Sequence, residues 1–544
     1  MSIFILLMKK FLLLPLLFPL FSGAQGPLRV EIEARSDADN YYIIPAGNAG
    51  LVLFNETWDN SQRGRKMLSF TMFNSDFLEV WTKTFPVLSG LSYVKHDVAD
   101  GHLYVLLSES GRAANFQILS LDYSSGEIMS NPGKMPQKTA IEDFNVINGM
   151  AYIGGRTLPT TGQILGRSCL IYMACGIPLF FGGMEFKYQP VLYVADVSQG
   201  GRSVPILLKY AGSAMVGDIA RNEKTKNAEI LLLNRPKKDV FKMEIREYSG
   251  TEPGGVTKVS PNGNNELLSG KVMPLSDNGK VLIGTYGAPI KSKSAGERMN
   301  RAMGRTSAVT FANGLYISKF NNGEQEYLFY YPFSKFESFW SKIQGHSPGK
   351  KYDNRLESRL GYQLLVHDII EKNDAYTVVA EAYFPEYEQR VEYYYDAQGN
   401  MQHRTNSVFV GYRYTHAIIA GFSKEGEKLW DNSFEIMDIL TFNLKERVKV
   451  LLEGDNIVLA YSHNGLIKSK VIAEGQVIDG KQSTAIETNY PNDVVKSSWG
   501  SDMEFWYDNF FLTWGFQRIN NKTDRKDSGK TKRTVFYFNK IEFQ

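Results

Sequence analysis

Residues 93–107 read YVKHDVADGHLYVLL, two runs rich in Tyr, Val and Leu on either side of Asp100-Gly101. An Asp-Gly or Asn-Gly pair between apolar runs is a strong β-hairpin signal, because a type I′ turn needs positive φ at both central positions. A second hairpin follows, with the run Phe116 to Leu121 and a turn at Ser124-Ser125-Gly126. This part of the sequence therefore predicts four consecutive antiparallel strands.

The same four-stranded unit recurs about eight times. Two more clear copies turn at Asn148-Gly149 and Asn278-Gly279, and less regular copies begin near Tyr41, Gly217, Leu364, Val448 and Met503. Such repetition predicts a β-propeller, in which blades surround an axis and few sheet edges stay exposed. We expect an all-β closed propeller of about eight, alternatively seven, four-stranded blades. A two-domain β-sandwich protein would show a similar strand spacing.

The last copy contains three strands, Met503 to Tyr507, Phe510 to Phe516 and Thr534 to Ile541, before the sequence stops. The segment Leu28 to Glu33 alternates with period 2, as a strand does, but has no partner in its own vicinity. We expect this N-terminal strand to complete the last blade beside Thr534 to Ile541, which would pair the sheet edges of the first and last blades.

The N-terminal residues have the pattern of an export signal. Met8-Lys9-Lys10 is followed by the apolar run Phe11 to Phe21 and by Ser22-Gly23-Ala24 before Gln25. This predicts a cleaved signal peptide over residues 1–24, because the apolar run is too short to span a bilayer. No cysteine follows the cleavage site, so the mature chain is expected to be periplasmic or secreted and not a lipoprotein.

Composition excludes some functions. Without Lys9 and Lys10 the formal charge falls from +3 to +1, which argues against a nucleic-acid partner. Cys169 and Cys175 have five residues between them, so an exported chain allows a local disulfide, with two free thiols as the alternative. No histidine lies near this pair, and no phosphate-loop or calcium-loop spacing is present. We therefore expect neither a metal nor a cofactor.

Two second hairpins end alike, with Trp81 and Phe85 in one and Trp430 and Phe434 in the other. This Trp-x-x-x-Phe spacing resembles the outer hairpins of quinoprotein-type propellers, and the resemblance implies a tryptophan that docks between blades. The stretches Tyr362 to Tyr383, Tyr412 to Ile436 and Trp506 to Asn521, with the Ala-Gln end of the signal, resemble uncharacterised secreted propeller proteins of Bacteroidota. That resemblance implies a fold and a compartment, but no activity.

Within a single domain of residues 25–544, long insertions are expected at 156–187, 288–313, 332–361 and 385–413. All four connect the second to the third strand of a blade, or one blade to the next, so they should lie on one face and form a binding surface. The apolar segment 169–183 is expected to fold over the propeller surface, with docking on a partner protein or a membrane surface as the alternative. The candidate binding residues in the other three insertions are Arg298, Arg301, Arg305, Phe336, Trp340, Tyr393 and Tyr394.

For catalysis the sequence offers little. His367-Asp368 and His416 lie on predicted strands of the sixth blade, where adjacent residues point to opposite faces, so structural histidines are the favoured interpretation. The leading hypothesis is a non-catalytic propeller that binds a protein or glycan partner. The alternative is a glycan hydrolase with carboxylates at the central channel, which a cluster of inward-pointing Asp or Glu with perturbed pKa values would favour.

Overall fold

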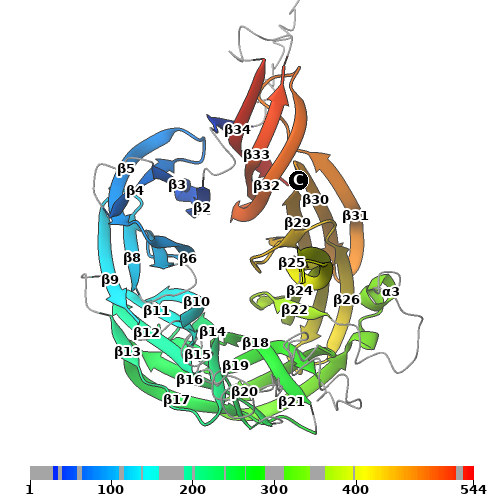
Figure 1. Ribbon diagram of the computed structural model, residues 1–544. Coiled ribbons are helices and arrows are strands. Elements are labelled where there is room, and N and C mark those ends of the chain that lie inside the picture. The colour runs from blue at the N-terminus through cyan, green and yellow to red at the C-terminus, as the bar shows by residue number, and fades with distance from the viewer. Residues whose placement is uncertain are drawn as a thin grey trace, which may run out of the picture.

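The computed structural model describes residues 28–543 except 35–39, 58–63, 110–114, 136–138, 158–188, 199–202, 238–239, 264, 288–311, 344–361, 396–397 and 522–530. The described residues form eight antiparallel β-sheets, seven of four strands and one of six, arranged around a common axis (Figure 1). Each sheet is one blade, so the predicted all-β propeller is confirmed.

Blades are numbered here in chain order, and strands within a blade run from the channel outward (Figure 1). Blade 1 consists of β2 (Tyr41–Pro45), β3 (Leu51–Thr57), β4 (Arg65–Phe73) and β5 (Glu79–Leu88). Blade 2 consists of β6 (Leu91–Ala99), β7 (His102–Glu109), β8 (Asn115–Asp122) and β9 (Ile128–Lys134). Blade 3 consists of β10 (Thr139–Ile147), β11 (Met150–Thr157), β12 (Pro190–Asp196) and β13 (Val204–Ile206), and blade 4 of β14 (Ser213–Arg221), β15 (Ala228–Lys237), β16 (Val240–Ser249) and β17 (Glu252–Val259).

Blade 5 consists of β18 (Glu266–Pro274), β19 (Lys280–Gly287), β20 (Gly314–Asn321) and β21 (Glu324–Pro332). Blade 6 consists of β22 (Gln363–Val366), β24 (Ala375–Tyr395), β25 (Met401–Ser423) and β26 (Lys428–Glu435), with the short β23 (Ile370–Lys372) and β27 (Leu440–Thr441). Blade 7 consists of β28 (Lys449–Glu453), β29 (Asn456–His463), β30 (Leu466–Ala473) and β31 (Gln476–Ala485), and blade 8 of β32 (Val494–Tyr507), β33 (Phe510–Asn520), β34 (Lys532–Glu542) and β1 (Arg29–Glu33). The described helices are η1 (Gly47–Ala49), η2 (Phe333–Lys335) and α3 (Glu337–Ile343). Within the described ranges, no helix has the length and apolar composition needed to cross a bilayer.

The core of the described residues is divided into eight clusters of buried apolar side chains, and each cluster spans two neighbouring blades. One of them joins blade 8 to blade 1, where Leu53 packs with Trp506 and Phe538. Packing between blades therefore continues around the whole ring, and stability comes from burying apolar area at each blade interface.

Ring closure follows the predicted strand exchange. β1 pairs antiparallel with β34, in a register that sets Arg29 opposite Asn539 and Glu33 opposite Val535. The N-terminal strand is thus the outermost strand of blade 8, and the sequence-based prediction is confirmed. β1 thus supplies the fourth strand of blade 8 and joins the N-terminal segment to the last blade.

A buried arginine anchors this closing strand. The guanidinium of Arg29 donates to Gln517 Oε1 at 2.8 Å, Asn539 Oδ1 at 3.1 Å and the Glu487 carbonyl at 3.1 Å. It also forms an ion pair with Glu31 at 2.9 Å and lies over the Tyr537 ring, 4.3 Å from its centroid. The donors of Arg29 therefore connect β1 to three strands or loops of blade 8.

The two tryptophans of the Trp-x-x-x-Phe hairpins dock between blades. Trp81 on β5 donates its indole N–H to the Tyr123 carbonyl of blade 2 at 2.9 Å. Trp430 on β26 packs over Gly475 in blade 7, where a Cβ would lie 2.5 Å from the ring. Tyr327 on β21 takes the same position without a tryptophan, and its hydroxyl donates to the Lys424 carbonyl of blade 6 at 2.9 Å.

This docking predicts a specific glycine requirement. Gly475 and Gly454 are both turn glycines of blade 7 with positive φ, +77° and +51°, but nothing lies within 4 Å of a Cβ placed at Gly454. Gly454→Ala should cost about 1 kcal/mol of backbone strain, whereas Gly475→Ala should cost about 2 to 4 kcal/mol because the methyl also displaces Trp430. Chemical denaturation of both variants measures the difference, and equal losses would contradict the docking argument.

Candidate functional site

Seven innermost strands or their ends carry a charged residue at the same level of the channel. Each lies three or four residues before the end of the first strand or strand pair of its blade, as Lys95 does in β6 and Lys271 in β18. We name this set the channel belt, and it consists of Lys95, Asp143, Asp218, Lys271, Asp368, Lys449 and Glu504.

Cations and anions of the channel belt are paired across blade boundaries. Lys95 lies 3.2 Å from Asp143, and Lys449 lies 2.7 Å from Glu504. Lys271 bridges two carboxylates, with its Nζ 3.0 Å from Asp218 and 2.8 Å from Asp368. These ion pairs join blades 2 and 3, 7 and 8, and 4, 5 and 6.

Two of the carboxylates also bind the backbone of the following blade. Asp143 Oδ2 accepts the N–H of Ile219 at 2.9 Å, and Asp218 Oδ2 accepts the N–H of Val272 at 2.9 Å. These N–H groups face the channel from the innermost strand, which has no further strand to pair with. Since a buried N–H needs an acceptor, the belt carboxylates satisfy the inner sheet edges.

The pKa values of two belt carboxyls, Asp218 and Asp368, are shifted in opposite directions. Burial raises the pKa of Asp218 to about 6, although the ammonium of Lys271 acts in the opposite direction. Desolvation also acts to raise the pKa of Asp368, but the charge and hydrogen bond of Lys271 outweigh it and lower that pKa. The Asp218 side chain is 5% exposed and that of Asp368 is 88% exposed. Of these two carboxyls, Asp218 is therefore the one that can hold a proton near neutral pH.

The histidines singled out in the sequence contact other residues of the fold. His367 Nε2 lies 2.8 Å from Glu381 Oε1, and that buried oxygen also accepts the N–H groups of Arg447 and Val448 at 2.7 Å. Asp368 is engaged with Lys271 instead. His416 is buried, with its ring centroid 6.4 Å from that of Phe339. The neighbouring residues His367 and Asp368 thus have different partners. They lie between β22 and β23, so their predicted place on a strand is corrected.

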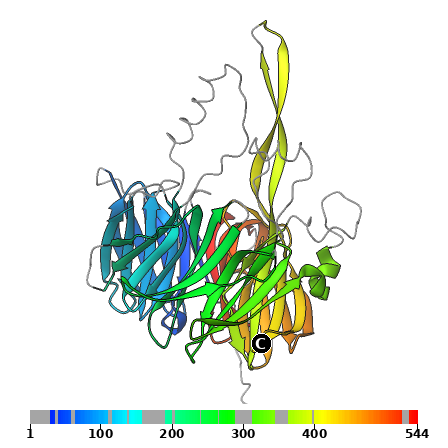
Figure 2. The same ribbon diagram turned by 90° about the horizontal axis from the view of Figure 1, so that it is seen from below.

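The fourth insertion differs from its expectation as a loop. Residues 385–395 continue β24 and residues 401–413 continue β25, paired from Pro385 opposite Tyr412 to Tyr395 opposite Met401. We call residues 385–413 the arm. Figure 2 shows the arm standing out from the end of the ring where connections between second and third strands emerge. Tyr393 and Tyr394 are exposed on it, 68% and 51% respectively.

The described part of the third insertion, residues 332–343, packs on the ring. Phe336 is fully buried, and Trp340 is partly buried against the same core cluster between blades 5 and 6. Ser338 at the start of α3 donates its N–H to Asp431 of β26 at 3.0 Å. Phe336 therefore belongs to the core and offers no surface to a partner, so its selection as a contact residue is corrected. Helical spacing alone could not tell these two roles apart.

Several candidates lie outside the described residues. These are the signal peptide, the cysteine pair Cys169 and Cys175, the apolar segment 169–183, and Arg298, Arg301 and Arg305. The disulfide stays a prediction, which thiol titration of the purified protein without reductant would test. Among the residues that are described, no group of three or more His, Cys, Asp or Glu side chains is arranged to hold a metal ion.

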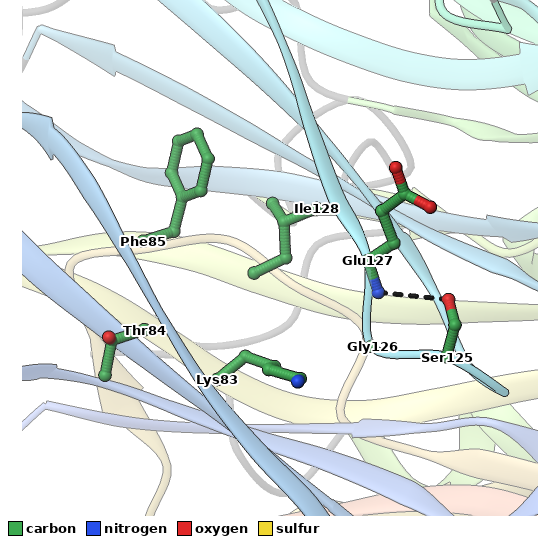
Figure 3. Close-up of a pocket in the computed structure, with 7 residues that line it drawn as sticks. All are labelled: Lys83, Thr84, Phe85, Ser125, Gly126, Glu127 and Ile128. Carbon is green, nitrogen blue, oxygen red and sulfur yellow. Dashed lines mark hydrogen bonds between the residues drawn. The ribbon is translucent and has the colours of Figure 1, made fainter.

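A small hollow of about 350 Å³ lies between β5 and the turn that leads into β9 (Figure 3). Its lining includes Lys83 and Phe85 from blade 1 and Ser125 and Glu127 from blade 2. The Glu127 N–H donates to Ser125 Oγ at 3.1 Å, so part of the polar lining is already engaged. The hollow lies beside the docked Trp81, at the outer seam between two blades.

Comparison with known proteins gives neither a matching family model nor a matching curated protein. Among solved structures, a europium-containing methanol dehydrogenase is 10% identical with a TM-score of 0.43, over 94% of this chain and 92% of that chain. The β-propeller domain of the Trilobed protease from Pyrococcus furiosus is 8% identical with a TM-score of 0.31, over 81% and 100%. A protein of unknown function from Dyadobacter fermentans is 7% identical with a TM-score of 0.28, over 95% and 100%. These likenesses concern the fold alone, and it is the ring of blades described above that makes this chain a β-propeller.

Proposed function

We propose that this chain is an exported, non-catalytic β-propeller that binds a protein or glycan partner through the face that bears the arm. The observation that carries the proposal is topological. Connections between the second and third strands of a blade, and connections between blades, emerge at one end of the ring. All the long connections belong to this set: β11 to β12, β19 to β20, β21 to β22 and the arm.

The opposite end of the ring supports the same assignment. It carries hairpin turns of a few residues, such as Asp100-Gly101 and Asn148-Gly149, whose φ values of +50°, +77°, +50° and +73° fit type I′ turns. Such turns offer little surface to a macromolecule. Binding surfaces commonly lie on long connections held by a rigid scaffold.

The channel belt is compatible with a structural role. Its lysines are engaged by carboxylates of neighbouring blades, and two of its carboxylates accept backbone N–H groups. These contacts connect blades at the narrow centre of the ring, where neighbouring strands lie closest. We infer that the belt serves mainly to hold the blades in register.

Replacing residues 386–411 by Asn-Gly tests the binding proposal, because Pro385 and Tyr412 are paired and a two-residue turn can join them. We expect an unchanged melting temperature and a loss of at least tenfold in partner capture by the immobilised protein from extracts of its source, analysed by mass spectrometry. Glu453→Ser with Asp455→Ser at the opposite end of the ring is the matched control. Full capture by the arm variant together with loss in the control would contradict the proposal.

A second candidate function is glycan hydrolysis, which one observation favours. Asp218, with its raised pKa of about 6, and the ionised Asp368 both contact the same Lys271 Nζ. A protonated and an ionised carboxyl close together are the pair that glycoside hydrolysis uses. If this chain hydrolyses polysaccharides, Asp218→Asn and Asp368→Asn should each reduce the release of reducing ends by at least 100-fold. Activity that persists in both variants would remove these residues from the reaction.

A further inference from the structure

The arm has two chemically different faces. Residues 387, 389, 391, 393 and 395 of β24 alternate with their neighbours, and β25 sets residues 409, 407, 405, 403 and 401 opposite them. This side, which we call the aromatic face, contains no Asp, Glu, Lys or Arg, and its main side chains are Tyr387, Val391, Tyr393, Tyr395, Met401 and Phe409. The other side carries the charged residues Glu386, Glu388, Arg390, Glu392 and Arg404, together with Tyr394 near the tip.

The aromatic face is exposed along its length. Tyr393, Tyr395 and Met401 at the tip are 68%, 74% and 65% exposed, and Tyr387 and Val391 are about half exposed at 50% and 49%. The polar residues Gln389, Thr405 and His403 lie among these side chains. So many exposed large apolar side chains on one side of a ribbon still mark an interaction site.

The apolar surface continues onto the ring at the base of the arm. Phe409 lies 5.6 Å from Tyr387 and 6.1 Å from Phe442, between ring centroids. Phe442 is 67% exposed, and the nearby Leu440 and Leu444 are 40% and 37% exposed. We call Leu440, Phe442 and Leu444 the base patch. Tip, aromatic face and base patch thus form one uncharged strip.

We propose that the occupant of this strip is a second copy of the same chain, with two arms packed antiparallel around a two-fold axis. In this arrangement the tip of each arm covers the base patch of the other. Residue 391, midway between the tip and Tyr387, then lies close to the axis. A two-fold contact of this kind is self-complementary and closes at a dimer.

The area of the strip favours this arrangement over arms that touch only each other. Eleven residues at ~3.3 Å each give an arm of about 35 Å, and two strands with their side chains are about 10 Å wide. Arm-on-arm contact then buries roughly 700 Å² in total, which is below the about 1,200 Å² of a stable interface. Covering both base patches supplies the additional area, and it requires the antiparallel order.

Charge favours a second copy as well. Two identical surfaces meet without repulsion only when like charges do not face each other, and the aromatic face carries no acidic or basic residue outside its single His403. The rings of this face pack at an angle to their cross-strand partners, with 61° between Tyr387 and Phe409 and 51° between Tyr393 and His403. This does not give the row of coplanar rings that would form a flat platform for a sugar chain.

Sedimentation velocity on the purified protein alone tests the proposal, so a partner from an extract plays no part in the result. We expect a reversible dimer at 1 to 50 µM and at least a 30-fold weaker association for Tyr393→Ser with Tyr395→Ser. Glu388→Ser with Glu392→Ser, on the opposite side of the arm, should leave the dimer intact, and all variants should melt like the native protein. A monomer at 50 µM, or equal weakening by both pairs, would overturn the proposal without affecting the partner-binding proposal.

Site-specific oxidation tests which side of the arm meets the second copy. Val391→Cys should form a disulfide-linked dimer with a second copy, whereas Glu392→Cys, one residue along but on the opposite side, should not. The native chain, with its own two cysteines, sets the background under the same oxidant. Cross-linking of Glu392→Cys as fast as Val391→Cys would rule out a contact through the aromatic face.

Discussion

Replacing Arg29 by methionine is expected to lower the free energy of unfolding by about 3 to 5 kcal/mol. The change removes a buried cation and leaves the side-chain oxygens of Gln517 and Asn539 and the Glu487 carbonyl without their donor. It also leaves Glu31 with Arg533 as its remaining cation, 2.9 Å away. A buried acceptor that loses its donor costs more than the hydrogen bond itself contributed. Guanidinium denaturation measures the loss.

Arg518→Met is the matched control for this variant, since Arg518 lies on the same blade but is exposed and stacks on Trp499 at 5.2 Å. The free energy of unfolding of this control should fall by less than about 1 kcal/mol. If Arg29→Met were as mild as Arg518→Met, β1 would contribute to closure through its backbone pairing alone.

Replacing Lys271 by methionine should lower the free energy of unfolding by about 3 to 5 kcal/mol at pH 7, because the Asp218 carboxylate would stay buried without its cation. Lys445→Met is the control, as that lysine is half exposed and pairs with Asp502 at the mouth of the channel. A surface pair of this kind should cost less than about 1 kcal/mol.

The deficit in the free energy of unfolding of Lys271→Met, relative to the native protein, should also depend on pH. Burial already raises the pKa of Asp218 to about 6 in the native protein, and the loss of Lys271 raises it further, while the unfolded value stays at the ordinary value for Asp. The folded variant then binds more protons than the unfolded chain between these values, so its stability rises as the pH falls from 7 towards 4. The deficit should therefore shrink at pH 5, and adding Asp218→Asn should abolish this dependence. A deficit equal at pH 5 and pH 7 would show that Asp218 does not titrate as described.

The repeat and its closure could be predicted because both rest on local signals. Asp100-Gly101 and its equivalents mark each hairpin, and the alternation of Leu28 to Glu33 without a neighbouring partner indicates a strand that pairs far away. Trp81 and Trp430 were recognisable by their spacing, whereas Tyr327 was not, because the same docking position holds a different aromatic ring.

The channel belt could not be found by the same route. Its members are single charged residues separated by 48 to 97 positions, and two adjacent members, Asp143 and Asp218, carry the same sign. One signal was present: aligning the copies on their first turn sets a charged residue three or four positions before the strand end in seven blades. Which lysine meets which carboxylate depends on the order of blades around the ring, which pairs Lys271 with two neighbours.

The arm was expected as a loop because its tyrosines are mixed with charges. In a ribbon with both faces in solvent, this mixture separates into an aromatic and a charged side, so alternation was itself a strand signal. The helical pattern around Phe336 indicated a helix but not its environment, since an apolar stripe can meet the ring or a partner equally well.

The position of β1 has a consequence for how the chain is made. Arg29 contacts Asn539, 510 residues later, so the outermost strand of blade 8 is synthesised first and its neighbours last. At about 5 to 20 residues per second, translation separates the two by roughly 25 to 100 s. During that interval the blades already made can assemble in order, while the first strand waits unpaired. Completion of the ring must therefore wait until β34 has been made. Any factor that shields an unpaired strand during this delay should raise the yield of folded protein without changing its final stability.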